Sequence, residues 1–321
     1  MPYDLDETPS SASWRKIGFN KRAGVAIPLF SLYSADSIGI GEVSDLSILG
    51  DWCQKVGLSI IQLLPMNDVG FAFRPYDAQS SFALDPIYLR LDCLDGVEAS
   101  AFKNETNALR IRYPAGEKPV DYGIKGAKLE LLWKMFCSCK RDENSFKIFT
   151  ENQSYWLDDY ALFKALKEKY QEASWESWEE DHRQRHPEVI KQAERDFEQT
   201  ILFHKWLQWQ LYTQFLHVKR DLSQKGVLLK GDLPFLVARD SADVWAHQSF
   251  FNLALATGAP PDDYHANGQR WGMPPYQWDK LEENGYEYFS QKLKYAENFY
   301  DLYRIDHVIG AYRLWVIPVE A

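Results

Sequence analysis

Three helix-periodic segments are each followed by a short, almost continuously apolar run, and this repetition restricts the folds that the chain can adopt. The apolar runs cover 58–65, 227–237 and 303–309. Runs of this kind are typical of strands that a parallel sheet buries on both faces. Helices that alternate with such strands predict an α/β fold with a parallel sheet.

Length and charge narrow the possible classes of protein. The 321 residues suffice for one large barrel-type domain or two ordinary domains. A balance of 36 basic against 46 acidic residues gives a net charge of −10, which argues against nucleic acid or an anionic membrane surface as a partner. No apolar stretch reaches the about 18 residues that cross a membrane. The polar start, 1–16, lacks the apolar core of a signal peptide.

The number and spacing of the cysteines indicate the cellular compartment in which the protein works. The chain contains Cys53, Cys93, Cys137 and Cys139. The last two have C-x-C spacing, but no second Cys or His pair stands near them to complete a zinc site. We therefore expect reduced thiols and a cytoplasmic protein.

Aromatic residues are abundant, with 12 Trp, 18 Tyr and 18 Phe making up 15% of the chain. Aromatic rings cover the flat C–H faces of sugars well, so carbohydrate is a natural substrate class for an acidic, aromatic-rich protein. The competing interpretation is that most of these rings fill a core. Composition alone leaves both interpretations open.

The segment between the first two helix–strand units differs from the rest. Residues 95–195 are charged, helix-periodic and poor in strand signals. We expect a helical insertion within one barrel-type domain that spans 1–321. The charged runs of the segment are expected to form solvated helix faces rather than a binding patch.

Polar residues interrupt the apolar runs where a barrel would place its active site. Arg304, Asp306 and His307 lie in 303–309, and Asp232 lies in the run before it. Active sites of (β/α)8 barrels gather at the C-terminal ends of strands. Side chains two apart in a strand share a face, so Arg304 is expected to keep the Asp306 carboxylate ionised. The spacing leaves open whether this pair is catalytic or structural, and Asp232 equally fits a structural hydrogen bond.

A long segment, 258–278, is rich in Gly, Pro and aromatic residues. Connections of this length in compact domains tend to be lids or binding loops. Trp271 and Tyr276 in this segment are candidate platforms for sugar rings.

Six sequence blocks occur in a fixed order: SIGIGEVSDL, IQLLPMND, RPYDAQSSFALDPIYL, KGDLPFLVARDSADVW, GAPPDDYHANGQRWGMPPYQW and YRIDHVIGAYRLW. Together they cover most of 24–91 and 225–318. In these blocks the chain resembles the 4-alpha-glucanotransferases (amylomaltases or disproportionating enzymes, glycoside hydrolase family 77) of the α-amylase superfamily. The sequence of these blocks is most similar to the branch that contains the plant cytosolic disproportionating enzyme. That branch usually carries N-terminal starch-binding modules, and none is recognised before residue 20.

The resemblance implies the N-terminal portion of a (β/α)8 TIM barrel and a retaining mechanism. The Asp of the family's RIDH block is the nucleophile, so Asp306 is expected to form a covalent glucosyl–enzyme intermediate. Arg304 would hold it ionised, and His307 would belong to the same sugar pocket. The implied substrates are maltooligosaccharides and other α-1,4-glucans, and no metal or organic cofactor is implied.

The resemblance also implies roles for three further residues. Tyr76 corresponds to the tyrosine that stacks on the glucose being transferred, Asp232 to an aspartate at the floor of the site, and Trp271 to a tryptophan on the acceptor side. RPY replaces the more usual SPY, and MPPY replaces the more usual NPLY.

A retaining enzyme needs a second carboxyl group as acid/base. In the family this Glu lies on a strand after the RIDH strand, and here Glu320 is the one acidic residue after Asp306. We therefore expect residues 1–321 to be the N-terminal part of a longer enzyme and to be inactive alone. The rival interpretations are an α-glucan hydrolase of the same superfamily and a non-catalytic glucan-binding protein.

Overall fold

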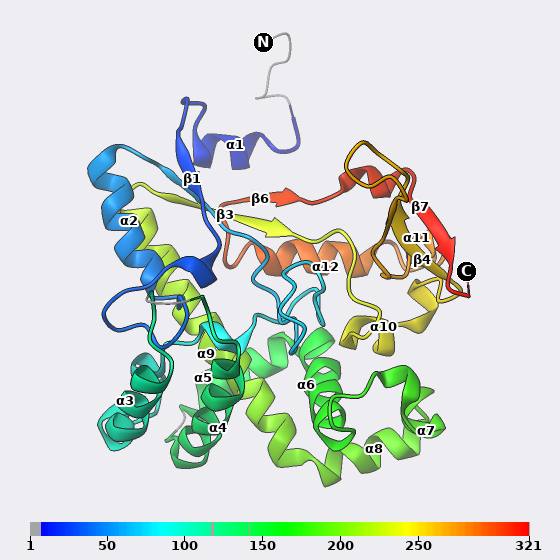
Figure 1. Ribbon diagram of the computed structural model, residues 1–321, viewed down its shortest axis with the longest axis horizontal. Helices are drawn as coiled ribbons and strands as arrows, with labels where there is room; N and C mark the ends of the chain where they lie inside the picture. The colour runs from blue at the N-terminus through cyan, green and yellow to red at the C-terminus, as the bar shows by residue number, and fades with distance from the viewer. Residues whose placement is uncertain (1–7, 117–118, 141, 321) are drawn as a thin grey trace.

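The structure, a computed structural model, describes residues 8–116, 119–140 and 142–320 (Figure 1). The helices are α1 (Ser11–Ile17), α2 (Asp45–Val56), α3 (Lys103–Arg112), α4 (Gly123–Ser138), α5 (Glu143–Asn152), α6 (Ser154–Lys169), α7 (Glu180–Arg183), α8 (Pro187–Asp196), α9 (Glu198–Gln224), α10 (Ala242–Ala246), α11 (Trp278–Glu283) and α12 (Glu287–Ala296). The strands are β1 (Gly24–Ala26), β2 (Ile60–Gln62), β3 (Leu228–Leu233), β4 (Leu255–Ala259), β5 (Gln269–Arg270), β6 (Leu302–Ile305) and β7 (Trp315–Pro318).

Four strands form a parallel sheet in the order β1-β2-β3-β6. The three predicted helix–strand units are present, because α2 precedes β2, α9 precedes β3 and α12 precedes β6. The strands are shorter than the apolar runs that predicted them, with three, six and four residues. The α/β fold with a parallel sheet is therefore confirmed.

Two glycines show how the local sequence sets these units. Gly57 ends α2 in a left-handed conformation with φ 78°, and its amide donates to carbonyls of the last turn. Gly231 lies within β3, where an added Cβ would come 2.5 Å from the ring of Tyr300. The absence of a side chain at Gly231 lets this ring pack directly against the strand.

The predicted helical segment, 95–195, contains α3 to α8 and no strand among its described residues. Figure 1 shows these helices, in green, gathered on one side of the parallel sheet. α6 packs along α9, and residues of both helices belong to the main hydrophobic core. The segment therefore shares its core with the sheet-bearing part of the chain.

The charged runs of this segment are not all solvated, contrary to the expectation. Lys125 of α4 and Lys164 of α6 lie 2.8 and 3.1 Å from the carboxylate of Asp68, and Lys125 also lies 2.8 Å from Asp85. All four side chains are buried. A buried ammonium group needs such partners because an unpaired charge is costly to remove from water. The partners lie in another part of the chain, where helix periodicity cannot reveal them.

The third apolar run is more exposed than a strand buried on both faces would be. β6 ends at Ile305, and Val308 and Ile309 follow in a short 3-10 helix with 54% and 48% of their surface exposed. β6 stands at the end of the strand order, so among the described strands it pairs with β3 alone. An edge strand leaves one side without a strand partner, which accounts for this exposure.

A second sheet fixes the conformation of part of the long segment 258–278. β4 pairs antiparallel with β5 on one side and with β7 on the other. The amide of Trp271 donates to the Thr257 carbonyl at 2.9 Å, and the amide of Thr257 donates to the Met273 carbonyl at 2.8 Å. These bonds fix the position of Trp271 relative to β4.

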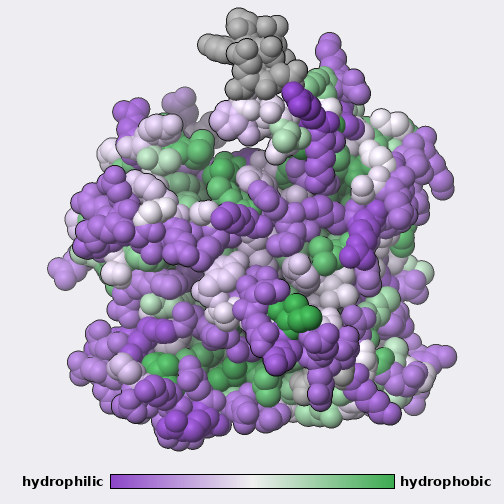
Figure 2. All heavy atoms as spheres, turned by 180° about the vertical axis from the view of Figure 1, so that it is seen from behind, coloured by the Kyte–Doolittle hydropathy of each residue, from purple (hydrophilic) through white to green (hydrophobic). Residues whose placement is uncertain are grey.

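Many of the aromatic rings lie in the core or pack against it, as the core interpretation of the composition predicts. Figure 2 shows a largely hydrophilic face with separate hydrophobic patches. Within residues 8–116, 119–140 and 142–320, no helix is long and apolar enough to cross a membrane. All four cysteines lie in these ranges, and none forms a disulfide.

Candidate active site

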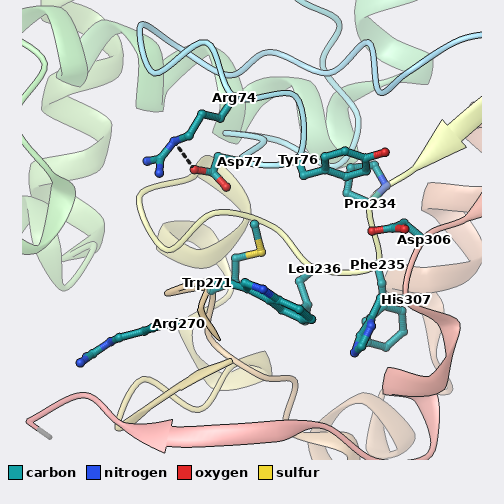
Figure 3. Close-up of a pocket in the computed structure, with 11 residues that line it drawn as sticks. Arg74, Tyr76, Asp77, Pro234, Phe235, Leu236, Arg270, Trp271, Asp306 and His307 are labelled. Atoms are coloured by element: carbon teal, nitrogen blue, oxygen red, sulfur yellow. Dashed lines mark ion pairs between the residues drawn. The ribbon is translucent and has the colours of Figure 1, made fainter. Parts of the chain in front are cut away.

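A cavity of about 510 Å³ opens beyond the carboxyl ends of β3 and β6 (Figure 3). Its lining comes from the loop after β2, the chain after β3, the strand β5 with the residues after it, and the turn after β6. The lining residues are Arg74, Tyr76, Asp77, Pro234, Phe235, Leu236, Arg270, Trp271, Met273, Asp306 and His307. Four of the predicted site residues, Tyr76, Trp271, Asp306 and His307, are therefore brought together.

Two further predicted residues, Asp232 and Arg304, contact the lining. They are paired positions on β3 and β6. Nη1 of Arg304 donates to both carboxylate oxygens of Asp232, at 2.8 and 2.7 Å, and Nη2 forms an ion pair with Asp306. The hydrogen bonds to Asp232 and the charges of both carboxylates raise the pKa of Arg304 above its usual value. The guanidinium is therefore a permanent positive charge between two carboxylates, and the predicted contact between Arg304 and Asp306 is present.

Tyr76 lies on the loop that follows β2, and its ring lines the cavity. Its hydroxyl donates to Oδ2 of Asp232 at 2.8 Å. Burial, together with this bond to a carboxylate, raises the pKa of Tyr76. The hydroxyl therefore stays protonated and anchors one edge of the ring, leaving its faces available to a ligand.

His307 and Trp271 form another part of the wall. The amide of Asp306 donates to the Leu233 carbonyl at 3.0 Å, so the backbone of Asp306 stays bonded to β3. His307 then takes a left-handed conformation with φ 51°, which is uncommon for a residue other than glycine. Its ring meets the ring of Trp271 edge to face, with centroids 4.8 Å apart. Figure 3 shows Tyr76 on the opposite side of the cavity from Trp271.

The structure does not place Tyr276 in the site, and the expectation that it is a sugar platform is wrong. Only 5% of its surface is exposed, and its hydroxyl donates to the carbonyl of Phe235 at 2.8 Å. Its ring packs edge to face on Phe289, with centroids 4.9 Å apart. Burial raises the pKa of its phenol. Tyr276 supports the chain after β3 from within the core, and a ring with no exposed face cannot stack on a sugar.

Arg74 and Asp77, which were not predicted from the sequence, line the cavity on either side of Tyr76 along the chain. Nε of Arg74 lies 2.7 Å from Oδ2 of Asp77, and 75% of the Arg74 side chain is exposed. Burial raises the pKa of Asp77, although the charge of Arg74 opposes this. Their positions in the block RPYD, next to a predicted site residue, were the signal that could have identified them.

The chemistry available in the cavity is that of carboxylates, guanidinium groups and aromatic faces. Asp77 and Asp306 are the carboxylates among the lining residues. In the described ranges, no group of three His, Cys, Asp or Glu side chains could hold a metal ion. A carboxylate at the wall of an aromatic cavity suits nucleophilic attack on a sugar.

Sequence comparisons identify the group of proteins to which the chain is similar. A family profile described as 4-alpha-glucanotransferase matches residues 27–321. A 4-alpha-glucanotransferase of Chlamydia caviae is 37% identical over 319 residues, which make up 97% of this chain and 59% of that protein. The 4-alpha-glucanotransferase DPE2 of Oryza sativa subsp. japonica is 33% identical over 312 residues, which make up 93% of this chain and 33% of that protein.

A solved structure agrees with these relatives. The amylomaltase from Streptococcus agalactiae in complex with acarbose has a TM-score of 0.81 and 26% identity, covering 94% of this chain and 62% of that one. The chain thus spans about three fifths of the length of the chlamydial protein and of the streptococcal structure. The long profile match and the identity to these relatives show that the chain belongs to the 4-alpha-glucanotransferase family and has part of its barrel-type fold.

Proposed function

We propose that the protein transfers α-1,4-linked glucosyl or glucan units from one maltooligosaccharide to the 4-hydroxyl group of another, with retention of configuration. One observation carries this proposal: the Asp306 carboxylate, held by Arg304, lies at the wall of a cavity that also presents the rings of Tyr76 and Trp271. This arrangement offers a nucleophile and stacking surfaces to the same sugar.

The reaction has two steps. Asp306 attacks the anomeric carbon of the donor, the glycosidic bond breaks, and the departing oxygen takes a proton from an acid. The 4-hydroxyl of the acceptor then attacks the glucosyl–Asp306 ester while the same group removes its proton, and Asp306 is released as a carboxylate. The ion pair with Arg304 places a positive charge beside the carboxylate that is released.

The neighbouring residues bind the sugar. The ring of Tyr76 stacks on the glucose being transferred, and His307 contacts the same unit. Asp232, which is buried at the floor of the site, holds Tyr76 and Arg304 in place from beneath. Trp271 stacks on the acceptor. Support comes from the bond between Tyr76 and Asp232, and from the position of Trp271 across the cavity.

The acid/base group must lie about 5–5.5 Å from the nucleophile. The resemblance places it on a strand after the strand of Asp306, and we assign it to no residue among those described. Glu320 lies too near the strand of Asp306 in sequence for this role. The sheet edge at β6, where one side has no described strand partner, is consistent with this assignment.

The biological setting is also part of the proposal. We place the protein in maltose and starch or glycogen metabolism in the cytoplasm, with 95–195 as a helical insertion within one catalytic domain. Absence of disulfides among the four cysteines supports this compartment.

The test is to incubate the full-length protein with maltotriose and to separate the products. Transfer of a maltosyl unit yields glucose and maltopentaose in equal amounts at early times, and transfer of a glucosyl unit yields maltose and maltotetraose in equal amounts. Glucose and maltose without longer products would instead identify an α-glucan hydrolase. Binding of maltooligosaccharides without turnover would identify a glucan-binding protein.

A further inference from the structure

A second cavity, of about 290 Å³, adjoins the cavity at Asp306. The two share four lining residues, Arg74, Asp77, Trp271 and Met273. We call the second cavity the outer chamber; beyond the shared residues, its lining includes Arg239 and Asp240 from the chain after β3. In Figure 3, Arg74 and Asp77 lie at the end of the first cavity that is remote from Asp306. The outer chamber therefore continues the active-site cavity away from the nucleophile.

The charged groups of the outer chamber are matched in pairs. Arg74 contacts Asp77 at 2.7 Å, Arg239 contacts Glu176 at 2.8 Å, and Asp240 contacts Lys167 at 2.7 Å. Each charged lining residue thus has an opposite charge within contact distance. A phosphate would need unmatched positive charge, whereas a neutral ligand with many hydroxyl groups does not.

The wall of the outer chamber is fixed by backbone bonds. The amide of Ala238 donates to the Ala78 carbonyl at 2.9 Å, and the amide of Ala242 donates to the Gln79 carbonyl at 2.8 Å. These bonds join the loop that carries Arg74 and Asp77 to the segment that carries Arg239 and Asp240. The chamber is therefore formed before a ligand arrives, as is usual for binding sites.

The pair of Arg74 and Asp77 suits the hydroxyl groups of a sugar. A guanidinium group can only donate hydrogen bonds, an ionised carboxylate can only accept them, and a hydroxyl group does both. Two neighbouring hydroxyl groups of one glucosyl unit can therefore accept from Arg74 and donate to Asp77. Trp271, which lines both chambers, adds an aromatic surface between the two positions.

We propose that the outer chamber binds glucosyl units further along the α-glucan chain than the unit at Asp306, and that the Arg74–Asp77 pair sets the preference for chain length. This inference rests on the proposed function, since it takes an α-glucan as the ligand. It adds a binding site and two specificity-determining residues to that function.

The experiment measures binding by titration calorimetry in the full-length Asp306→Asn protein, which cannot turn over the sugar. Maltose, maltotriose, maltopentaose and maltoheptaose are the ligands. We expect Arg74→Ala, and independently Asp77→Asn, to raise the dissociation constant about tenfold for maltoheptaose and progressively less for shorter sugars. The matched control is Lys191→Ala, which removes an exposed ion pair of the same i,i+3 spacing on α8 and leaves every constant unchanged.

The inference would be overturned if the variants lost the same affinity for sugars of every length. It would also be overturned if neither variant lost affinity for maltoheptaose. Tighter binding of phosphorylated than of unmodified maltoheptaose would overturn it too, because that result would require unmatched positive charge. The maltotriose assay on the protein with Asp306 intact reports on the proposed function separately. If that assay shows no transfer while calorimetry still shows a loss of affinity that depends on sugar length, the proposed function is wrong and the binding site remains.

Discussion

Arg304 and Asp232 face one another across two adjacent parallel strands, with Nη1 of Arg304 2.8 and 2.7 Å from the two carboxylate oxygens of Asp232. This contact uses one amino group of the guanidinium and leaves the other for Asp306. Because both strands are bonded in register, the guanidinium is held in one position. Asp232 thus orients the guanidinium group that forms an ion pair with Asp306, while the Tyr76 hydroxyl donates to the same Asp232 carboxylate.

The first prediction concerns the nucleophile. Asp306→Asn in the full-length protein should lower transfer between maltooligosaccharides by at least about 10⁴-fold, since an amide cannot form the glucosyl ester. The thermal unfolding midpoint should stay within a few degrees of the parent. Activity within tenfold of the parent would remove Asp306 from this role.

The second prediction separates the ring of Tyr76 from its hydroxyl group. Tyr76→Ala removes both the stacking surface and the bond to Asp232, and should weaken binding of the donor sugar about tenfold or more. Tyr76→Phe keeps the ring and should weaken binding about three- to tenfold, because only one hydrogen bond is lost. Equal effects of the two substitutions on binding would show that the ring itself does not contact the sugar.

The third prediction concerns Trp271. If its ring shields the glucosyl ester from water and holds the acceptor, Trp271→Ala should lower transfer more than hydrolysis. The products from maltotriose should shift toward glucose and maltose, and Trp271→Phe should shift them less. A product ratio that Trp271→Ala leaves unchanged would argue for the hydrolase interpretation.

The fourth prediction concerns the buried cation that joins the helical segment to the site loop. Nζ of Lys125 contacts Asp68 and Asp85, which flank the loop that carries Tyr76. Lys125→Met leaves two buried carboxylates without this partner and should lower the free energy of unfolding by about 3–5 kcal/mol. Lys147→Met removes an exposed pair and should change it by less than about 1 kcal/mol. Urea denaturation monitored by circular dichroism measures the free energy of unfolding of both variants. A small change of similar size in the two variants would show that the buried cluster tolerates the loss of its cation.

The fifth prediction concerns the pH dependence of stability. Burial lowers the pKa of Lys292 to about 8, although the charge of Asp243 opposes this. An unfolded lysine has a pKa of about 10.4. Between these values the unfolded state binds more protons than the folded state, so the contribution of Lys292 to stability rises with pH.

We therefore expect the stability of the wild-type protein relative to Lys292→Met to increase from pH 8 to about pH 10, by an amount on the order of 2 kcal/mol. Below pH 8 the difference should be constant. Denaturation curves of both proteins at each pH give the difference between their free energies of unfolding. Taking this difference cancels the effects of the other titrating groups. A difference that falls as the pH rises would contradict a buried, destabilised charge.

The sequence alone determined the three helix–strand units and most of the residues that the site brings together. Apolar runs after helical periods identified β2, β3 and β6, because burial on both faces selects a continuous apolar stretch. The two-residue spacing of Arg304 and Asp306 predicted their contact, since side chains alternate along a strand. Both inferences depend on local geometry, which a short stretch of sequence specifies.

Only the tertiary structure decided the long-range contacts. It placed Arg304 against Asp232, 72 positions away along the chain, because the register of β3 with β6 depends on how the helices between them pack. It buried Lys125 against Asp68 and withdrew Tyr276 into the core, although the charge and composition of both segments suggested exposure. Burial is a property of surroundings supplied by distant segments, so neither periodicity nor composition could fix it.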